Sequence, residues 1–289
     1  MSRTASAVVF ALLGFAANSV LCRMALRETG IDPASFTSLR LVTGAVVLIA
    51  LVVAGTPIKG NAPQRTLGGN WPSATLLLLY AAAFSYAYVG VTTGTGALLL
   101  FGAVQVIMIG VGLHAGERID ARAALGWLVA VVGIMLLVLP GVASAPLLNG
   151  SLMLVAGSAW GWYSLRGRGS GNPLGDTAGN FLRAVPGALT LSAWGWPSHE
   201  LPMRGIALAA LSGGIASGLG YAAWYAALPR LRAIAAANLQ LLVPILAAAC
   251  GVVLFHEAMT PRLLAASLCV LGGVAVATHA LRSRPEQPR

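Results

Sequence analysis

Charged residues are scarce in this sequence. Asp, Glu, Lys and Arg make up 9% of its 289 residues, whereas hydrophobic residues make up 57%. Soluble domains have about 25% charged residues, and a chain with so few charges could not cover its surface in water. The composition therefore excludes an ordinary soluble protein and indicates a chain surrounded largely by lipid.

Acidic residues are scarcer still, with eight of them against eighteen basic residues. All eight lie in loops or near the ends of apolar runs: Glu28, Asp32, Glu117, Asp120, Asp176, Glu200, Glu257 and Glu286. A proton-coupled pump usually needs a titratable group within the membrane. We therefore expect passive, gradient-driven transport, or coupling through a group that the sequence does not identify. Glu117 and Glu257 lie beside basic residues, which favours a role in helix capping or ion pairing.

The sequence also lacks the motifs of catalysis and nucleotide binding. We find no nucleotide-binding loop, metal-ligand cluster or nucleophile triad in it. Its cysteines, Cys22, Cys250 and Cys269, lie inside apolar runs, which predicts no disulfide framework. The net charge of +10 is distributed between apolar runs and so indicates membrane topology rather than nucleic-acid binding. We expect no enzyme activity, no metal and no cofactor.

Ten apolar runs approach the length of about 20 residues that a membrane-spanning helix needs. They cover residues 5–26, 34–54, 73–91, 95–114, 122–140, 150–166, 177–195, 205–227, 232–254 and 261–281. The first run could be read as a signal peptide, but its length favours a retained helix. With the N-terminus in the cytoplasm, twelve basic residues fall on the cytoplasmic side and three on the other, as the positive-inside rule requires. The predicted fold is all-α and integral to the inner (plasma) membrane, with ten transmembrane helices and both termini cytoplasmic.

The chain contains an internal repeat. The sequence LRLVTGA at Leu39–Ala45 recurs as LRAVPGA at Leu182–Ala188, and at a similar offset Gly133 matches Gly273. Two units of five helices, residues 1–143 and 144–289, explain these matches. Because five is odd, the second unit must be inverted relative to the first, a common plan of secondary transporters.

Several segments resemble the EamA-type repeat of the drug/metabolite transporter superfamily. They are FAANSVLCRMAL, SLRLVTGA and GERI in the first half, and LQLLVPILAA followed by HEAMTPR in the second. This resemblance covers both halves and implies a ten-helix transporter of small metabolites. The family's proline in the fourth helix is replaced here by Val104. In length, minimal loops and aromatic content, the chain is most similar to the amino-acid exporters of this group.

Polar side chains inside the apolar runs are candidates for the substrate path, because lipid makes them costly. The alternative role of each is a hydrogen bond between neighbouring helices. The residues of this kind that we expect at the site are Asn18, Ser19, Gln105, Asn238 and Gln240.

Aromatic residues make up only 7% of the chain, but they gather in a few runs. Rings near helix ends suit an interfacial belt, whereas deeper rings can wall a cavity for apolar or aromatic substrates. The aromatic residues that we predict to bind substrate are Tyr80, Phe84, Trp162, Tyr163 and Tyr225.

Arg40 and Arg183 occupy matching positions of the repeat, each about 10 Å into its helix at about 1.5 Å per residue. Each either snorkels to the membrane surface or attracts a substrate carboxylate at a cavity mouth, and we include both among the candidate site residues.

Two prolines and two glycines are candidate hinges. Pro186 and Pro244 remove backbone hydrogen bonds from their helices. Gly214 and Gly218 belong to a glycine-rich helix, for which close packing is the alternative role.

The sequence thus favours an exporter of small metabolites, chiefly amino acids including aromatic or apolar ones, that works by alternating access between its halves. The alternatives are a permease for another small solute, and a membrane enzyme or scaffold without transport activity. The expected partners are the small-molecule substrate and the lipid bilayer, with no nucleic acid, and the oligomeric state is open.

Overall fold

The computed structural model describes residues 3–55, 66–114, 121–138, 145–167, 170–194, 201–227 and 239–282. Within these ranges the chain forms helices and no strand, and each helix overlaps an apolar run expected from the sequence. The helices are α1 (Arg3–Glu28), α2 (Pro33–Val53), α3 (Trp71–Tyr88), α4 (Thr93–His114), α5 (Ala121–Val138), α6 (Leu147–Gly167), α7 (Pro173–Trp194), α8 (Met203–Leu211), η1 (Ser212–Leu219), α9 (Gly220–Ala227), α11 (Leu242–Phe255) and α12 (Pro261–Arg282).

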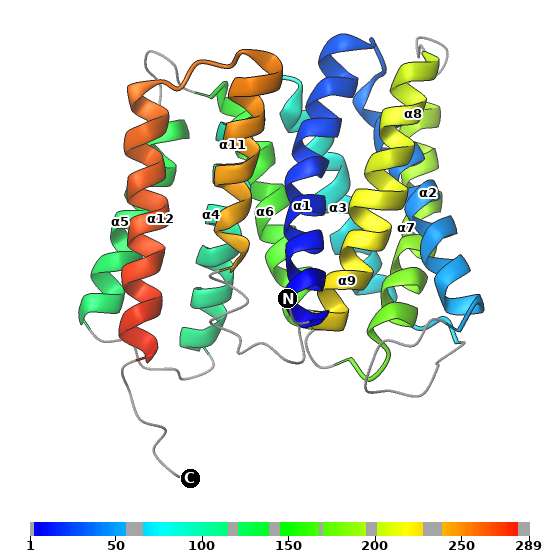
Figure 1. Ribbon diagram of the computed structural model, residues 1–289, viewed down its shortest axis with the longest axis horizontal. Coiled ribbons are helices and arrows are strands. Elements are labelled where there is room, and N and C mark those ends of the chain that lie inside the picture. The colour runs from blue at the N-terminus through cyan, green and yellow to red at the C-terminus, as the bar shows by residue number, and fades with distance from the viewer. Residues whose placement is uncertain are drawn as a thin grey trace.

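The helices run side by side in one bundle, with α5 and α12 at one edge and α2 and α7 toward the other (Figure 1). We call the end of the bundle that holds the start of α1 the lower end, and the end that holds the connection from α1 to α2 the upper end. Local sequence fixes several helix starts. Asp32 accepts hydrogen bonds from the amides of Ala34 and Ser35, and Asn70 accepts one from the amide of Ser73. Each of these caps precedes a proline within the first two helical positions, where proline suits the backbone.

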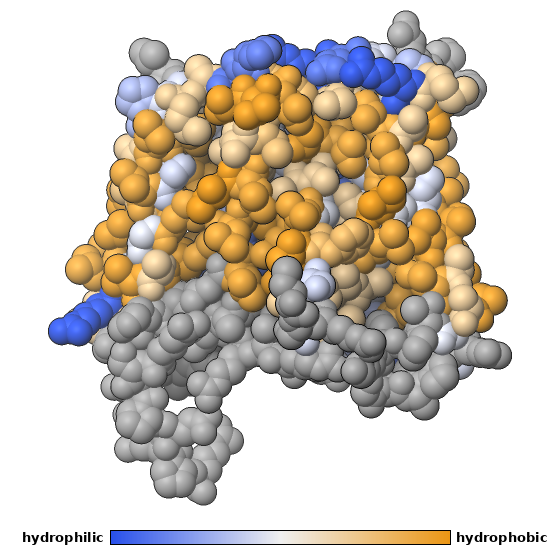
Figure 2. Space-filling model, in the orientation of Figure 1, coloured by the Kyte–Doolittle hydropathy of each residue, from blue (hydrophilic) through white to orange (hydrophobic). Residues whose placement is uncertain are grey.

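The middle of the visible face is apolar, and hydrophilic residues gather at the upper edge (Figure 2). Among the described residues, three helical stretches are long and apolar enough to cross a membrane: Thr4–Glu28, Pro33–Val53 and Met203–Ala227. Shorter apolar stretches cover Thr93–Met108, Ala121–Leu137, Leu242–Phe255 and Pro261–Ala277. These features are those of a multi-pass membrane protein. The count of ten spans and the cytoplasmic position of both termini stay predictions.

Helix contacts are reciprocal between the two halves of the chain. α3 packs on α6, while η1 and α9 pack on α1; likewise α4 packs on α6, and α11 packs on α1. α2 pairs with α7, and α5 pairs with α12. Small residues allow the closest of these approaches, because a Cβ on Gly126 would collide with the backbone of Gly273, and one on Gly273 with that of Gly126.

The span from Met203 to Ala227 contains a π-helical segment, η1, between α8 and α9. Segments of this kind are rare and frequently lie at functional sites. Gly214 and Gly218 belong to η1, and a Cβ on either would come within 3.3 Å of Val47 in α2. The glycines therefore provide close packing, and a bending role for them stays a prediction.

The two prolines differ in their settings. Pro186 lies inside α7, as expected. Pro244 is the third residue of α11, directly after a turn at Leu241. Residues 239 and 240 are helical as well, so the chain departs from regular helix at Leu241, just before Pro244. Hinge motion at either proline stays a prediction.

Candidate functional site

An aromatic cavity lies midway along the bundle, between helices of both halves. The first half contributes residues of α1, α3 and α4, and the second half contributes residues of α6 and α9. The lining residues are Phe15, Asn18, Ser19, Tyr80, Phe84, Leu100, Phe101, Trp160 and Tyr221, and all of them are buried. The cavity is closed to about 10 Å³, room for about one water molecule. A metabolite therefore fits only if these rings or helices move apart.

Trp160 is the centre of the aromatic cluster. Its ring centroid lies 5.0 Å from that of Tyr80, 4.9 Å from that of Tyr221 and 6.0 Å from that of Phe15. These tilted and edge-on arrangements are the ones that aromatic pairs prefer. The cluster joins α6 to α1, α3 and α9, so one set of rings contacts helices from both halves.

Arg40 is held against the wall of this cavity. Its side chain is 1% exposed, and its guanidinium carbon lies 5.1 and 5.0 Å from the ring centroids of Tyr80 and Phe84. Nη2 donates to the Tyr80 hydroxyl at 2.8 Å, and Nε donates to the Ser217 hydroxyl at 3.1 Å. Nη1 is buried and has no hydrogen-bond partner among the described residues. Arg40 therefore does not snorkel to the membrane surface, and its attraction of a substrate carboxylate stays a prediction.

A chain of hydrogen bonds connects Arg40 to α1. The Asn18 carbonyl oxygen accepts from the hydroxyls of Ser212 at 2.8 Å and Ser217 at 3.3 Å. Both serines belong to η1, so the π-helical segment presents two hydroxyls to Asn18, and Ser217 also accepts from Arg40. This polar chain runs along one side of the aromatic cavity.

The upper end is closed by an ion pair between the halves. Arg23 of α1 lies 3.5 Å from the Glu257 carboxylate, which follows α11, and the two side chains are 9% and 7% exposed. Arg23 also donates to the Tyr88 carbonyl at 2.7 Å. Glu257 accepts from the Thr93 amide at 2.8 Å and thus caps the N-terminus of α4. As expected, Glu257 forms a cap and an ion pair. The sequence indicated that Glu257 lies near a helix end, but it did not indicate that the carboxylate is buried.

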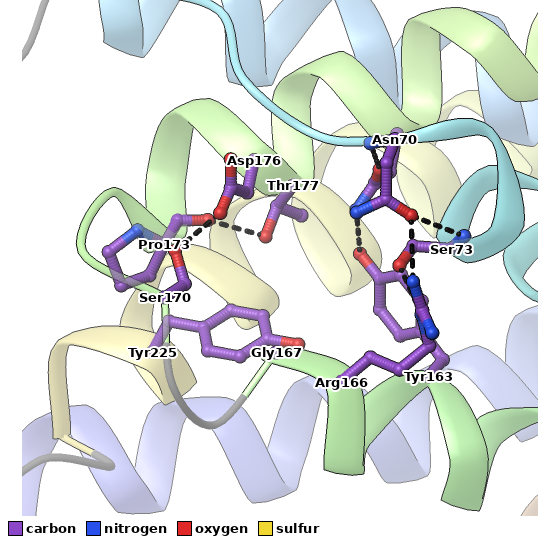
Figure 3. Close-up of a pocket in the computed structure, with 11 residues that line it drawn as sticks. Asn70, Ser73, Tyr163, Arg166, Gly167, Ser170, Pro173, Asp176, Thr177 and Tyr225 are labelled. Atoms are coloured by element: carbon purple, nitrogen blue, oxygen red, sulfur yellow. Dashed lines mark hydrogen bonds between the residues drawn. The ribbon is translucent and has the colours of Figure 1, made fainter.

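The lower end holds a polar pocket (Figure 3). Its lining consists of Asn70, Ser73, Tyr163, Arg166, Gly167, Ser170, Pro173, Asp176, Thr177, Asn180 and Tyr225. Asp176 accepts from the Gly69 amide at 2.7 Å, and Asn180 accepts from the Asn70 amide at 2.9 Å. The segment before α3 is thereby bound to the first turns of α7.

Arg183 also belongs to the lower end. Its Nη1 donates to the carbonyls of Gly68 at 2.6 Å and Gly179 at 2.9 Å. The side chain is half-buried and fixes the segment before α3. Arg183 therefore lies apart from the cavity that Arg40 borders.

The structure brings together some predicted site residues and separates others. Asn18, Ser19, Tyr80 and Phe84 line the cavity, whereas Tyr163 and Tyr225 line the lower pocket. Gln105 and Gln240 are buried outside both linings, and Asn238 lies outside the described residues. Substrate binding at any of these residues stays a prediction.

The structure does not place Trp162 at the cavity wall, where the sequence predicted it. It is 45% exposed on the surface of α6, while Trp160 is 4% exposed and lines the cavity. Two residues differ by about 200° around a helix with 3.6 residues per turn, so the two tryptophans face opposite directions. The sequence reasoning also missed Phe15, Phe101 and Tyr221 as lining residues. Each stands in an apolar run whose hydrophobicity is similar on all sides.

Apolar helices around a closed central cavity define a multi-pass membrane protein. Residues 149–278 match the EamA-like transporter family. An uncharacterized protein of Pseudomonas aeruginosa is 51% identical over 274 residues, covering 95% of this chain and 94% of that protein. The second half of this chain thus matches an EamA-like transporter domain, which indicates a transporter rather than an enzyme. A solved crystal structure aligns with 94% of this chain and with 98% of the chain in that structure, at a TM-score of 0.65. The two sequences are 21% identical, so this likeness shows a shared fold alone.

Proposed function

We propose that this protein exports small metabolites, with amino acids that carry aromatic or apolar side chains as its main substrates. The observation that carries the proposal is the aromatic cavity around Trp160, which both halves line and which is buried midway along the bundle. Rings of this kind hold apolar side chains by packing and stacking.

Transport in this proposal proceeds by alternating access between residues 1–143 and 144–289. The reciprocal contacts of the halves support this division. Both ends of the path are closed in this conformation: Arg23 and Glu257 join the halves above the cavity, and Asp176 and Asn180 bind the segment before α3 below it. Opening one end while the other stays closed would expose the cavity to one side at a time.

Two sequence features support the orientation and the direction of transport in this proposal. The excess of basic residues on one side favours cytoplasmic termini in the inner membrane. In length, minimal loops and aromatic content the chain is similar to the amino-acid exporter YddG, which supports export of amino acids.

Flux through purified protein in liposomes tests the proposal. Liposomes with and without protein are loaded with labelled phenylalanine, leucine, a hexose, a nucleobase or a polyamine, and efflux is followed down the gradient. We expect protein-dependent efflux of phenylalanine and leucine. Efflux of only the hexose or the nucleobase would favour a permease for another solute, and absence of efflux for every solute would reject a transport function.

A further inference from the structure

The guanidinium of Arg40 is a buried positive charge without a carboxylate partner in the described part of the chain. The acidic residues described there have other partners: Glu257 pairs with Arg23, Glu28 pairs with Arg204, and Asp32 and Asp176 accept backbone amides. Arginine stays protonated in proteins, and a buried charge is costly unless it is paired. The position therefore favours an anion that the described part of the chain does not supply.

The geometry leaves one donor of Arg40 available. Nε and Nη2 are bonded to Ser217 and Tyr80, while Nη1 is buried and unpartnered. The ring of Tyr221 also packs on Trp160, and its buried hydroxyl interacts with that of Tyr80. The guanidinium is a charged hydrogen-bond donor, which suits a carboxylate better than an ammonium group.

The cavity offers no comparable group for an amine. Its lining contains Asn18 and Ser19 as the polar residues beside tyrosines, and none of the lining residues is acidic. The Asn18 carbonyl oxygen, the strongest acceptor of the set, already accepts from Ser212 and Ser217. An ammonium group would therefore be bound mainly by cation–π contacts with the aromatic rings, whereas a carboxylate could accept a hydrogen bond from the charged guanidinium of Arg40.

We infer that the cavity selects small organic carboxylates with an aromatic or branched apolar body, with the carboxylate at Arg40 and the body against Trp160, and that it does not require an amino group. This inference rests on the proposed transport function and narrows its substrate class. Amino acids qualify through their carboxylate, and the corresponding acids without nitrogen qualify equally.

Binding of four matched ligands to the detergent-purified protein, measured by isothermal titration calorimetry, tests the inference. They are phenylalanine, 3-phenylpropionate, phenylalaninamide and 3-phenylpropanamide. We expect the two carboxylates to bind within about threefold of each other and both amides to bind at least about tenfold more weakly, as the loss of one charge-assisted hydrogen bond predicts. Amides that bind as tightly as carboxylates, or an absolute need for the amino group, would overturn the inference.

Arg40→Gln should abolish the discrimination between acid and amide, and Arg204→Gln, which removes an exposed arginine of the Glu28 pair, should preserve it. Discrimination that survives in Arg40→Gln would overturn the inference. The wild-type series decides the question by itself if the Arg40 variant does not fold. Failure of the transport proposal has a different signature, namely absence of liposome efflux for every solute.

Discussion

Arg40 and Arg183 stand at the same place in the repeated Leu-Arg sequence, yet their surroundings differ. Arg40 is enclosed by Tyr80 and Phe84 beside the central cavity, with one nitrogen unpaired. Arg183 is half-buried at the lower end and donates to the carbonyls of Gly68 and Gly179. One arginine therefore has an unpaired nitrogen beside a closed aromatic cavity, and the other holds the segment before α3.

The two copies of the repeated sequence thus keep an arginine at the same position but in different surroundings. In the first half the helix that carries the arginine faces the aromatic side chains of α3, whereas in the second it faces the segment before α3. In our proposal the Arg40 region binds solute and the Arg183 region closes the path, so that the two halves divide the work. The following changes test this division.

Replacing each arginine by methionine should give opposite results. Arg40→Met should reduce phenylalanine efflux to that of empty liposomes. It should keep the free energy of unfolding within about 1 kcal/mol of wild type, because relief of the buried charge offsets the loss of the hydrogen bonds to Tyr80 and Ser217. Arg183→Met should lower that free energy by about 1 kcal/mol, since it leaves two carbonyls without their donor. SDS titration measures the free energy of unfolding, and liposome efflux measures transport. A stability loss without an efflux loss in Arg40→Met, or an efflux loss without a stability loss in Arg183→Met, would contradict the division of roles.

Glu257→Gln tests the upper closure. The change leaves Arg23 buried without its counter-ion, so the free energy of unfolding should fall by about 3 kcal/mol. Glu28→Gln is the matched control, because its partner Arg204 is largely exposed and surface pairs contribute about 0–1 kcal/mol. Equal effects of the two changes in the same SDS titration would show that the upper ion pair does not hold the halves together.

Gly213→Ala tests the close contact of η1 with α2. A Cβ there would collide with the Arg40 carbonyl and the Thr43 hydroxyl, so the variant should lose about 2 kcal/mol of stability through overpacking. Gly272→Ala adds the same methyl group to α12, where the structure places no atom within 4 Å of it. That control should match wild type in SDS titration, and a Gly213 variant equal to it would mean that η1 can move away freely.

Tyr80→Phe should have a small effect. It keeps the ring but removes the hydroxyl that accepts from Arg40 at 2.8 Å, and the expected loss of stability is about 1 kcal/mol. Tyr163→Phe is the comparison at the lower end, where the hydroxyl accepts a longer, 3.5 Å hydrogen bond from Asn180. We expect its loss to be smaller, and a larger loss there would place the tighter polar packing at the lower end.

Sequence patterns predicted the helices well, because every helix of the described residues lies within or close to an apolar run between breakers. They also predicted Tyr80 and Phe84 as cavity residues. The choice of Trp162 over Trp160 failed because a helix in lipid is apolar toward both its lipid face and its core, so hydrophobic periodicity does not define the inward side. The π-helical geometry of η1 likewise depends on tertiary packing of its serines and glycines against α1 and α2, which local sequence does not encode.

The central claim is that the enclosed aromatic cavity is the substrate site, and the two tryptophans of α6 test it most directly. Trp160→Ala and Trp162→Ala make the same change two residues apart, one inside the cavity and one on the outer surface. With reconstituted protein matched by amount, phenylalanine efflux should fall at least about tenfold for Trp160→Ala, given the contact area that a buried indole provides, and stay within about twofold of wild type for Trp162→Ala. Equal efflux from the two variants, or a greater loss for Trp162→Ala, would contradict the claim.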